Sequence, residues 1–97
     1  MSRRFGVEIE FLSTVTTERV LMSLRAAGIR VEFEGYTHRT TPHWKIVSDG
    51  SCGYELVSPV LEGEAGLDEV RIAAAALEAA GAKVDKRCGL HVHFDAR

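Results

Sequence analysis

The sequence contains no long hydrophobic run and no excess of charge of one sign. No apolar segment approaches the ~20 residues of a membrane span or the core of a signal peptide, so we expect a cytoplasmic protein without a membrane partner. The 12 Lys and Arg residues and 14 Asp and Glu residues give a net charge of −2, and the N-terminal Arg3-Arg4 pair is too short to be a basic tract. We therefore expect no nucleic-acid partner.

Cysteine is also scarce, with only Cys52 and Cys88. No secretion signal accompanies them and their spacing is not that of a zinc knuckle, so we predict two reduced thiols. Each precedes a glycine, where a small buried residue suits a turn. A zinc site formed by Cys88, His91 and His93 is an alternative that needs a fourth ligand from elsewhere.

The chain lacks the H-E-x-x-H and H-x-E…C-x-x-C patterns of zinc hydrolases and deaminases, which makes a metal-dependent hydrolase the weaker hypothesis. It also lacks an internal repeat, a linker or a low-complexity segment. Its 97 residues, 45% hydrophobic and 27% charged, have the size and composition of one small globular domain with a single core. We therefore predict one domain over residues 1–97.

Alternation of polar and apolar residues predicts a strand near each end of the chain. Successive side chains of an extended segment point to opposite faces, so Glu8 and Glu10 share one face of the segment 4–13. By the same rule His91 and His93 share one face of the final strand, opposite its apolar residues. Two strands therefore offer four groups that can bind a metal ion.

Apolar residues at helical spacing predict two helices. The first begins near Glu18, with Thr16 or Thr17 as its cap, and ends at Gly28. The second covers residues 67–80, and its apolar stripe is formed by Leu67, Val70, Ala74 and Leu77.

Three further strands are predicted over residues 29–34, 44–48 and 54–58. The last two are expected to form an antiparallel hairpin around the turn-forming residues 49–53, and the polar segment 35–43 is expected to be a loop or a hairpin tip. The predicted fold class is α+β, with a mostly antiparallel sheet of about five strands and two helices on one face.

The polar side of this sheet is where chemistry is expected. If they share that side, five residues would form an acidic and imidazole-rich surface suited to hard divalent cations: Glu8, Glu10, Glu55, His91 and His93. The alternatives are a solvated strand face for the glutamates and ordinary surface histidines. The segment Asp49-Gly50-Ser51 can likewise be a turn without a functional role.

Four motifs in order resemble the putative amidoligase family of the carboxylate–amine ligase superfamily, which also contains glutamine synthetase and glutamate–cysteine ligase. They are Arg4-x-Gly6-x-Glu8-x-Glu10-Phe11, Trp44-x-x-x-x-Asp49-x-Ser51, Tyr54-Glu55-Leu56-Val57-Ser58-Pro59 and Cys88-Gly89-Leu90-His91-Val92-His93-Phe94-Asp95. Each motif alone is common. The four in sequence, spread over nearly the whole chain, are specific.

The resemblance implies a glutamine-synthetase-like fold and an ATP-dependent ligase. Such enzymes use Mg²⁺ or Mn²⁺ to phosphorylate a carboxylate, and an amine of an amino acid or peptide then displaces the phosphate to form an amide. By similarity the metal ligands are Glu8, Glu10, Glu55 and His91. His93 and Arg4 would contact the nucleotide phosphates, and Asp49 and Ser51 would lie near the substrate as catalytic residues.

The chain departs from the family in its length. Active members are expected to continue beyond the H-x-H strand with more of the sheet, another metal carboxylate and phosphate-binding arginines. This chain therefore resembles the N-terminal part of the ligase fold. A second copy or a complementary C-terminal chain is the expected partner, and a non-catalytic module for binding or assembly is the alternative function.

Overall fold

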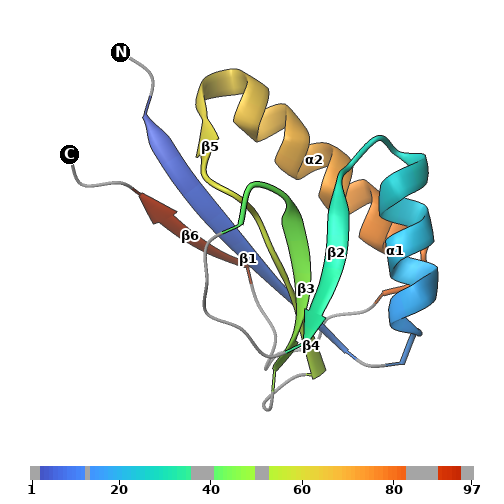
Figure 1. Cartoon of the computed structure of the whole chain (residues 1–97). Helices are drawn as coiled ribbons and strands as arrows, with labels where there is room; N and C mark the ends of the chain where they lie inside the picture. The colour runs from blue at the N-terminus through green and yellow to red at the C-terminus, as the bar shows by residue number, and fades with distance from the viewer. Residues whose placement is uncertain (1–2, 13, 36–40, 50–52, 83–89, 95–97) are drawn as a thin grey trace.

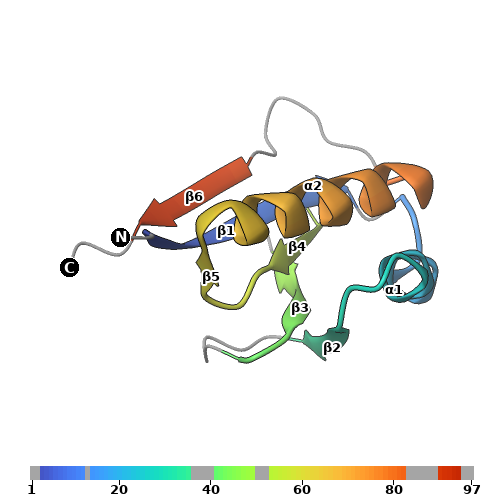
Figure 2. The ribbon, with the colours of Figure 1, turned by 90° about the horizontal axis from the view of Figure 1, so that it is seen from above.

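The computed structural model describes residues 3–12, 14–35, 41–49, 53–82 and 90–94. In chain order the elements are β1 (Arg4–Leu12), α1 (Thr17–Ala26), β2 (Val31–Gly35), β3 (Trp44–Asp49), β4 (Gly53–Val57), β5 (Leu61–Glu62), α2 (Gly63–Ala79) and β6 (Leu90–Phe94). The strands form one sheet, and the helices cover one of its faces (Figure 1; Figure 2). The predicted α+β class is confirmed.

The sheet is five strands wide, with β1 near one side. Glu8 and Ile9 of β1 pair with both β4 and β6, so those two strands lie on opposite sides of β1. Phe5 pairs with both β5 and β6, which makes β5 a continuation of the line of β4. The two-residue β5 was not predicted, because it is too short to show an alternating pattern.

The direction of β2 corrects one prediction. Strands β3 and β4 form the expected antiparallel hairpin, but β2 runs parallel to β3, with Val31 opposite Trp44. A hairpin joins antiparallel strands, so β2 and β3 do not form the hairpin that was one alternative for residues 35–43. Residues 36–40 of that segment lie outside the described part of the chain. The sheet is therefore mixed, with β2–β3 as the parallel pair among the described strands.

The hydrophobic core lies between the sheet and the helices. It takes alternate residues of β1, such as Phe5, Val7 and Phe11, which explains why the other residues of that strand can be polar. The remaining core side chains of the strands include Val31, Trp44, Ile46, Leu56 and Leu61, and those of the helices include Val20, Leu24, Ala73, Ala76 and Leu77. Burial of these groups supplies the main driving force for folding.

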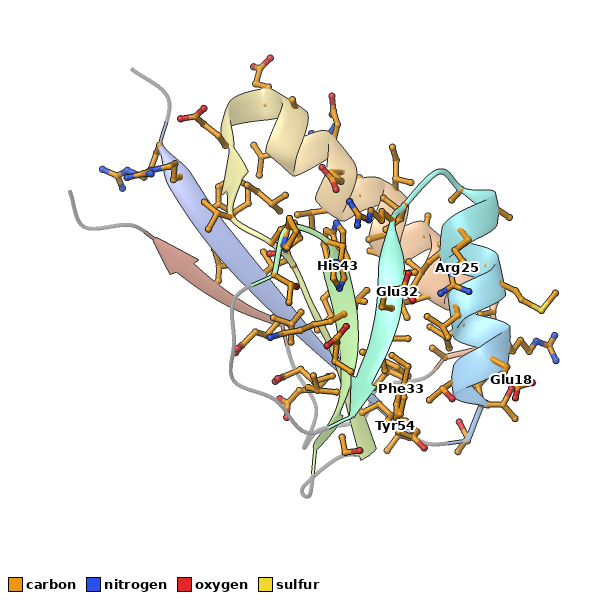
Figure 3. The ribbon with its side chains drawn as sticks, in the orientation of Figure 1. Glu18, Arg25, Glu32, Phe33, His43 and Tyr54 are labelled. Atoms are coloured by element: carbon orange, nitrogen blue, oxygen red, sulfur yellow. The ribbon has the colours of Figure 1, made fainter. Side chains whose placement is uncertain are left out.

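Helix α1 begins and ends as predicted. The Oγ1 atom of its N-cap residue, Thr16, accepts a hydrogen bond of 3.2 Å from the backbone N–H of Arg19. After the helix, Gly28 has a φ of 89°, a left-handed conformation that glycine adopts without strain. From the last turn, Arg25 bonds to the carbonyl oxygen of Val31 and to Glu32, and so it protects the edge of β2 (Figure 3).

Helix α2 starts four residues earlier than predicted and is rotated relative to the predicted stripe. Its buried residues are Gly66, Ala73, Ala76 and Leu77, while Leu67 is 50% exposed and Ala74 is also exposed. Small residues line the buried side and allow α2 to approach the sheet closely, as the contacts of Gly66 show below. None of the described helices is long and apolar enough to cross a membrane.

Candidate functional site

The candidate site lies on the face of the sheet that is turned away from the helices, called the open face here. Parity along each strand defines it, because neighbours in sequence alternate between the core and this face. In β3 and β4 the core residues Trp44, Ile46 and Leu56 alternate with Lys45, Val47, Glu55 and Val57. In β1 the open-face positions include Arg4, Gly6, Glu8 and Glu10.

Strand register brings the four predicted metal ligands to adjoining positions. Glu8 of β1 is directly opposite His91 of β6, and Glu10 of β1 is directly opposite Glu55 of β4. Directly opposed residues have Cβ atoms about 4.5–5.5 Å apart, and residues two apart on one strand share a face. The four positions therefore form one patch across three strands of the open face.

The two residues predicted to contact the nucleotide lie toward the start of β1. His93 is opposite Gly6, and Arg4 is opposite Glu62 of β5. Arg4 is exposed, and a Cβ atom built on Gly6 would lie 3.8 Å from Ser58 Oγ, an ordinary contact distance. Among the described side chains, none therefore crowds the open face at Gly6.

The two predicted catalytic residues are less well defined. Asp49 is the last residue of β3 and pairs with Gly53, the first residue of β4; the three residues between them lie outside the described part of the chain. Ser51, Cys52 and Cys88 lie outside the described residues, as do the side chains of Asp49, His91 and His93. Their expected roles stay predictions.

The chemistry and spacing of this patch suit a divalent cation. Carboxylate oxygens with an imidazole match the ligand preferences of Mg²⁺ and Mn²⁺, and opposed carboxylates can both reach one ion at bond lengths near 2.1 Å. Among the described residues, however, no three His, Cys, Asp or Glu side chains gather as a ready metal cage. The match to a divalent cation therefore rests on the positions that the backbone register gives these residues. In the structure Glu8, Glu10 and Glu55 each already interact with other groups of the protein.

One charged residue of the open face was missed by sequence reasoning. Lys45 is only 4% exposed, and it is the one buried charged residue among those described. In the register it is opposite Glu32 of β2 and Val57 of β4, and Val57 in turn is opposite Glu8. The signal was present in the sequence, because Lys45 interrupts the apolar run from Trp44 to Val47.

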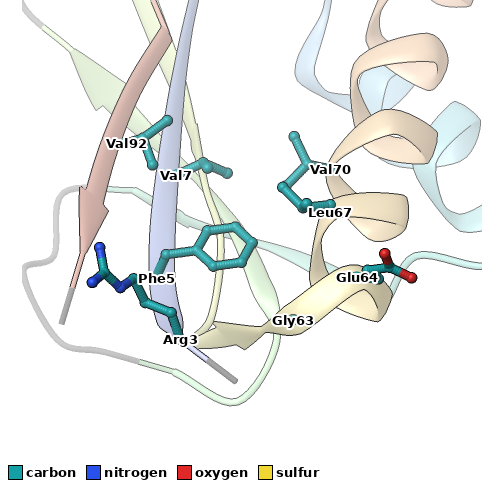
Figure 4. Close-up of a pocket in the computed structure, with 8 residues that line it drawn as sticks. All are labelled: Arg3, Phe5, Val7, Gly63, Glu64, Leu67, Val70 and Val92. Carbon is teal, nitrogen blue, oxygen red and sulfur yellow. The ribbon is translucent and has the colours of Figure 1, made fainter. Parts of the chain in front are cut away.

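A separate pocket of about 500 Å³ lies on the opposite side of the sheet, between α2 and strands β1 and β6 (Figure 4). Apolar side chains dominate its lining, with Phe5 and Val7 from β1, Leu67 and Val70 from α2, and Val92 from β6. Arg3 and Glu64 are the charged residues among the described residues that line it, and a single carboxylate gives too few ligands for a divalent cation. The carboxylates that strand register pairs lie on the open face and not in this pocket.

Comparison with known proteins gives one match. The model of the family described as "Putative amidoligase enzyme" matches residues 1–97, the whole chain. No curated protein and no solved structure matches significantly.

Proposed function

The chain belongs to the amidoligase enzyme family, and on that basis we propose that it is an ATP- and Mg²⁺-dependent carboxylate–amine ligase, or the part of one that binds metal and nucleotide. In this reaction a carboxylate oxygen attacks the γ-phosphorus of ATP and ADP leaves; an amine nitrogen then attacks the acyl carbon and phosphate leaves, forming an amide. The observation that carries the proposal is the register of Glu8 with His91 and of Glu10 with Glu55 on the open face.

In the proposed site the four residues of this patch hold the metal ions. Glu8 and Glu10 serve separate ions from β1, while His91 and Glu55 complete the ligand sets from the flanking strands. Bound Mg²⁺ or Mn²⁺ neutralises the phosphate oxygens and the charge that develops during phosphoryl transfer. The rigid pairing of three strands keeps the ligands in place, which reduces the cost of organising the site.

The nucleotide phosphates are proposed to lie along β1 toward its first residues. His93, opposite Gly6, and Arg4, at the start of the strand, supply hydrogen-bond donors at that end. The missing side chain at Gly6 gives a phosphate room to approach the backbone.

The substrates are proposed to be a carboxylate and an amine of amino-acid or peptide type, with Asp49 and Ser51 as the residues that contact them. Asp49 is the last residue of β3, at the closed end of the β3–β4 hairpin. We further propose a glutamine-synthetase-like fold in one domain, with a second copy or a complementary chain as its partner. A non-catalytic module for binding or assembly is the competing function.

Calorimetric titration of the purified protein with Mg²⁺ and a non-hydrolysable ATP analogue tests the proposal. The variant Glu8→Gln/Glu10→Gln removes two charges from the open face while it preserves side-chain shape. The matched control, Glu18→Gln/Glu78→Gln, removes two charges from exposed positions of α1 and α2. We expect saturable binding by the wild type and the control, and a loss of at least tenfold in the open-face variant.

The outcomes separate the two candidate functions. Binding that depends on Glu8 and Glu10 supports the ligase site, and the next measurement is phosphate release with amino acids and amines as acceptors. A folded wild-type protein that binds no Mg²⁺–nucleotide would contradict the metal and nucleotide site and would favour the non-catalytic module. Circular dichroism of each variant establishes that it is folded.

A further inference from the structure

The burial of Lys45 on the open face requires an explanation. Lysine is almost never fully buried unless its charge is paired, because the ammonium group loses its hydration inside the protein. Lys45 is 4% exposed and nonetheless lies on the polar side of β3, with Val47 as its open-face neighbour on the same strand. A negative charge must therefore lie within reach of its ammonium group.

The carboxylates of β2 already have other partners. Glu32, directly opposite Lys45, bonds to Arg25 at 3.1 Å through Oε1. Glu34 Oε2 lies 3.2 Å from His43 Nε2. These contacts draw the two β2 carboxylates toward Arg25 and His43.

The contact between Glu34 and His43 lies beside Lys45 in the strand register. Glu34 lies between residues that pair with Ile46 and Val47, whereas His43 precedes Trp44. Lys45 is therefore at a level between the two, and both side chains are mostly buried, at 24% and 13% exposure. On the β2 side, Lys45 thus borders a carboxylate whose Oε2 is already engaged by His43.

On the other side, the register leads from Lys45 to the proposed metal ligands. Glu55 is diagonal to Lys45 on the neighbouring strand, since Glu55 pairs with Val47. Glu8 lies two strands away in the row of Lys45, about 10 Å between backbones, with the short Val57 between them. The four-carbon stem of lysine and the two-carbon stem of glutamate can span that gap.

We propose that Lys45 is the built-in counter-ion of the carboxylates Glu8, Glu10 and Glu55, and that a divalent cation competes with it for them. This inference rests on the proposed metal site. Without metal, one ammonium group balances part of the charge of three carboxylates, which otherwise repel one another across β1 and β4. When a divalent cation binds, it replaces the ammonium group as the partner of the carboxylates. Because this pairing must first be broken, the carboxylates bind metal more weakly than they would without Lys45.

The first test measures the pairing without metal. Lys45→Met keeps the apolar stem and removes the charge, so we expect a lower thermal midpoint. The loss should shrink markedly in a Glu55→Gln background, because neutralising the carboxylate removes the need for the cation. Arg30→Met, at an exposed cation just before β2, is the matched control and should show no coupling with Glu55→Gln.

The second test measures competition with metal alone, by calorimetric titration of Mg²⁺. Lys45→Met should bind Mg²⁺ about tenfold or more tightly than the wild type, because a nearby positive charge has been removed. Lys45→Arg, which keeps the charge, should bind like the wild type. If Lys45→Met does not fold without metal, the comparison of Lys45→Arg with Lys45→Gln in the presence of Mg²⁺ replaces it.

The outcomes distinguish the two proposals. If the wild type and Lys45→Met bind Mg²⁺ with equal affinity, the competition is overturned while the metal site stands. If neither protein binds Mg²⁺, the metal site fails, and the competition fails with it. Absence of coupling between Lys45 and Glu55, Glu8 or Glu10 in the metal-free protein overturns the counter-ion role itself.

Discussion

The indole nitrogen of Trp44 donates a hydrogen bond of 2.7 Å to Oε1 of Glu69, which ties β3 to α2 across the core. Trp44 is 1% exposed and is the largest of the fully buried side chains. A buried indole N–H needs an acceptor, and the apolar side of the sheet offers few. Glu69 supplies this acceptor from α2, whose buried residues are otherwise apolar.

Replacing Glu69 tests how much this hydrogen bond contributes to the stability of the protein. Glu69→Leu should lower the free energy of unfolding by about 1–3 kcal/mol, because the buried N–H loses its partner. Glu69→Gln keeps an oxygen acceptor and should lose less. Urea unfolding measures both, with Glu78→Leu as the control at an exposed position of the same helix. An equal loss in that control would contradict the role of the hydrogen bond.

Ser58 holds the junction between β4 and β5 against β1. Its Oγ accepts a hydrogen bond of 2.9 Å from the N–H of Val7 and donates one of 2.7 Å to the carbonyl oxygen of Pro59. Its own N–H donates to the carbonyl oxygen of Val7 at 2.9 Å. The pairing register shifts by one residue here, and the Ser58 hydroxyl satisfies the Val7 N–H.

Ser58→Ala should therefore cost about 1–3 kcal/mol of unfolding free energy, because it leaves the Val7 N–H unpaired. Amide hydrogen exchange should also show faster exchange at Val7. Ser48→Ala, at an exposed position of β3, is the matched control and should change stability by no more than about 0.5 kcal/mol. Unchanged protection of Val7 in Ser58→Ala would contradict this assignment.

Gly66 permits the close approach of α2 to the sheet. A Cβ atom at this position would lie 2.9 Å from Leu61 Cβ, closer than Cβ atoms approach other atoms, and 3.1 Å from Phe5 Cζ, a tight contact, so the neighbours would have to shift. The helix itself would favour alanine by about 1 kcal/mol, but overpacking costs about 1–3 kcal/mol.

We expect the overpacking to dominate in Gly66→Ala, with a net loss of up to about 2 kcal/mol in denaturant unfolding. Ala74→Gly, at an exposed position of α2, gives the ordinary effect of glycine in this helix and should cost about 1 kcal/mol. A more stable Gly66→Ala protein would show that Leu61 and Phe5 can move aside.

Local patterns predicted much of this fold. The alternation in β1, the cap at Thr16, the glycine after α1 and the β3–β4 hairpin are all properties of short segments, and each is confirmed. The parallel pairing of β2 with β3 was missed because strand direction depends on the neighbour chosen in the sheet, which a single segment does not encode.

The buried side of α2 also could not be predicted from its own sequence. Its sequence fits more than one apolar stripe, since alanines occupy most of its central turns. The side of α2 that carries Gly66 faces the sheet, because a residue without a Cβ atom lets the helix lie close to Leu61 and Phe5. The residue types of the candidate site could be identified from the sequence, but their adjacency depends on the register of three strands.

The position of His91 opposite Glu8 leads to a prediction about metal preference. Imidazole binds Mn²⁺ better than Mg²⁺, which strongly prefers oxygen. His91→Asn replaces the proposed nitrogen ligand with an oxygen or nitrogen of an amide, so the ratio of Mn²⁺ affinity to Mg²⁺ affinity should fall roughly tenfold, equivalent to about 1.4 kcal/mol. Calorimetric titration of each ion measures the ratio, and the Mg²⁺ affinity of the same variant is the internal control. An equal loss of both affinities would instead assign His91 a structural role in pairing β6 with β1.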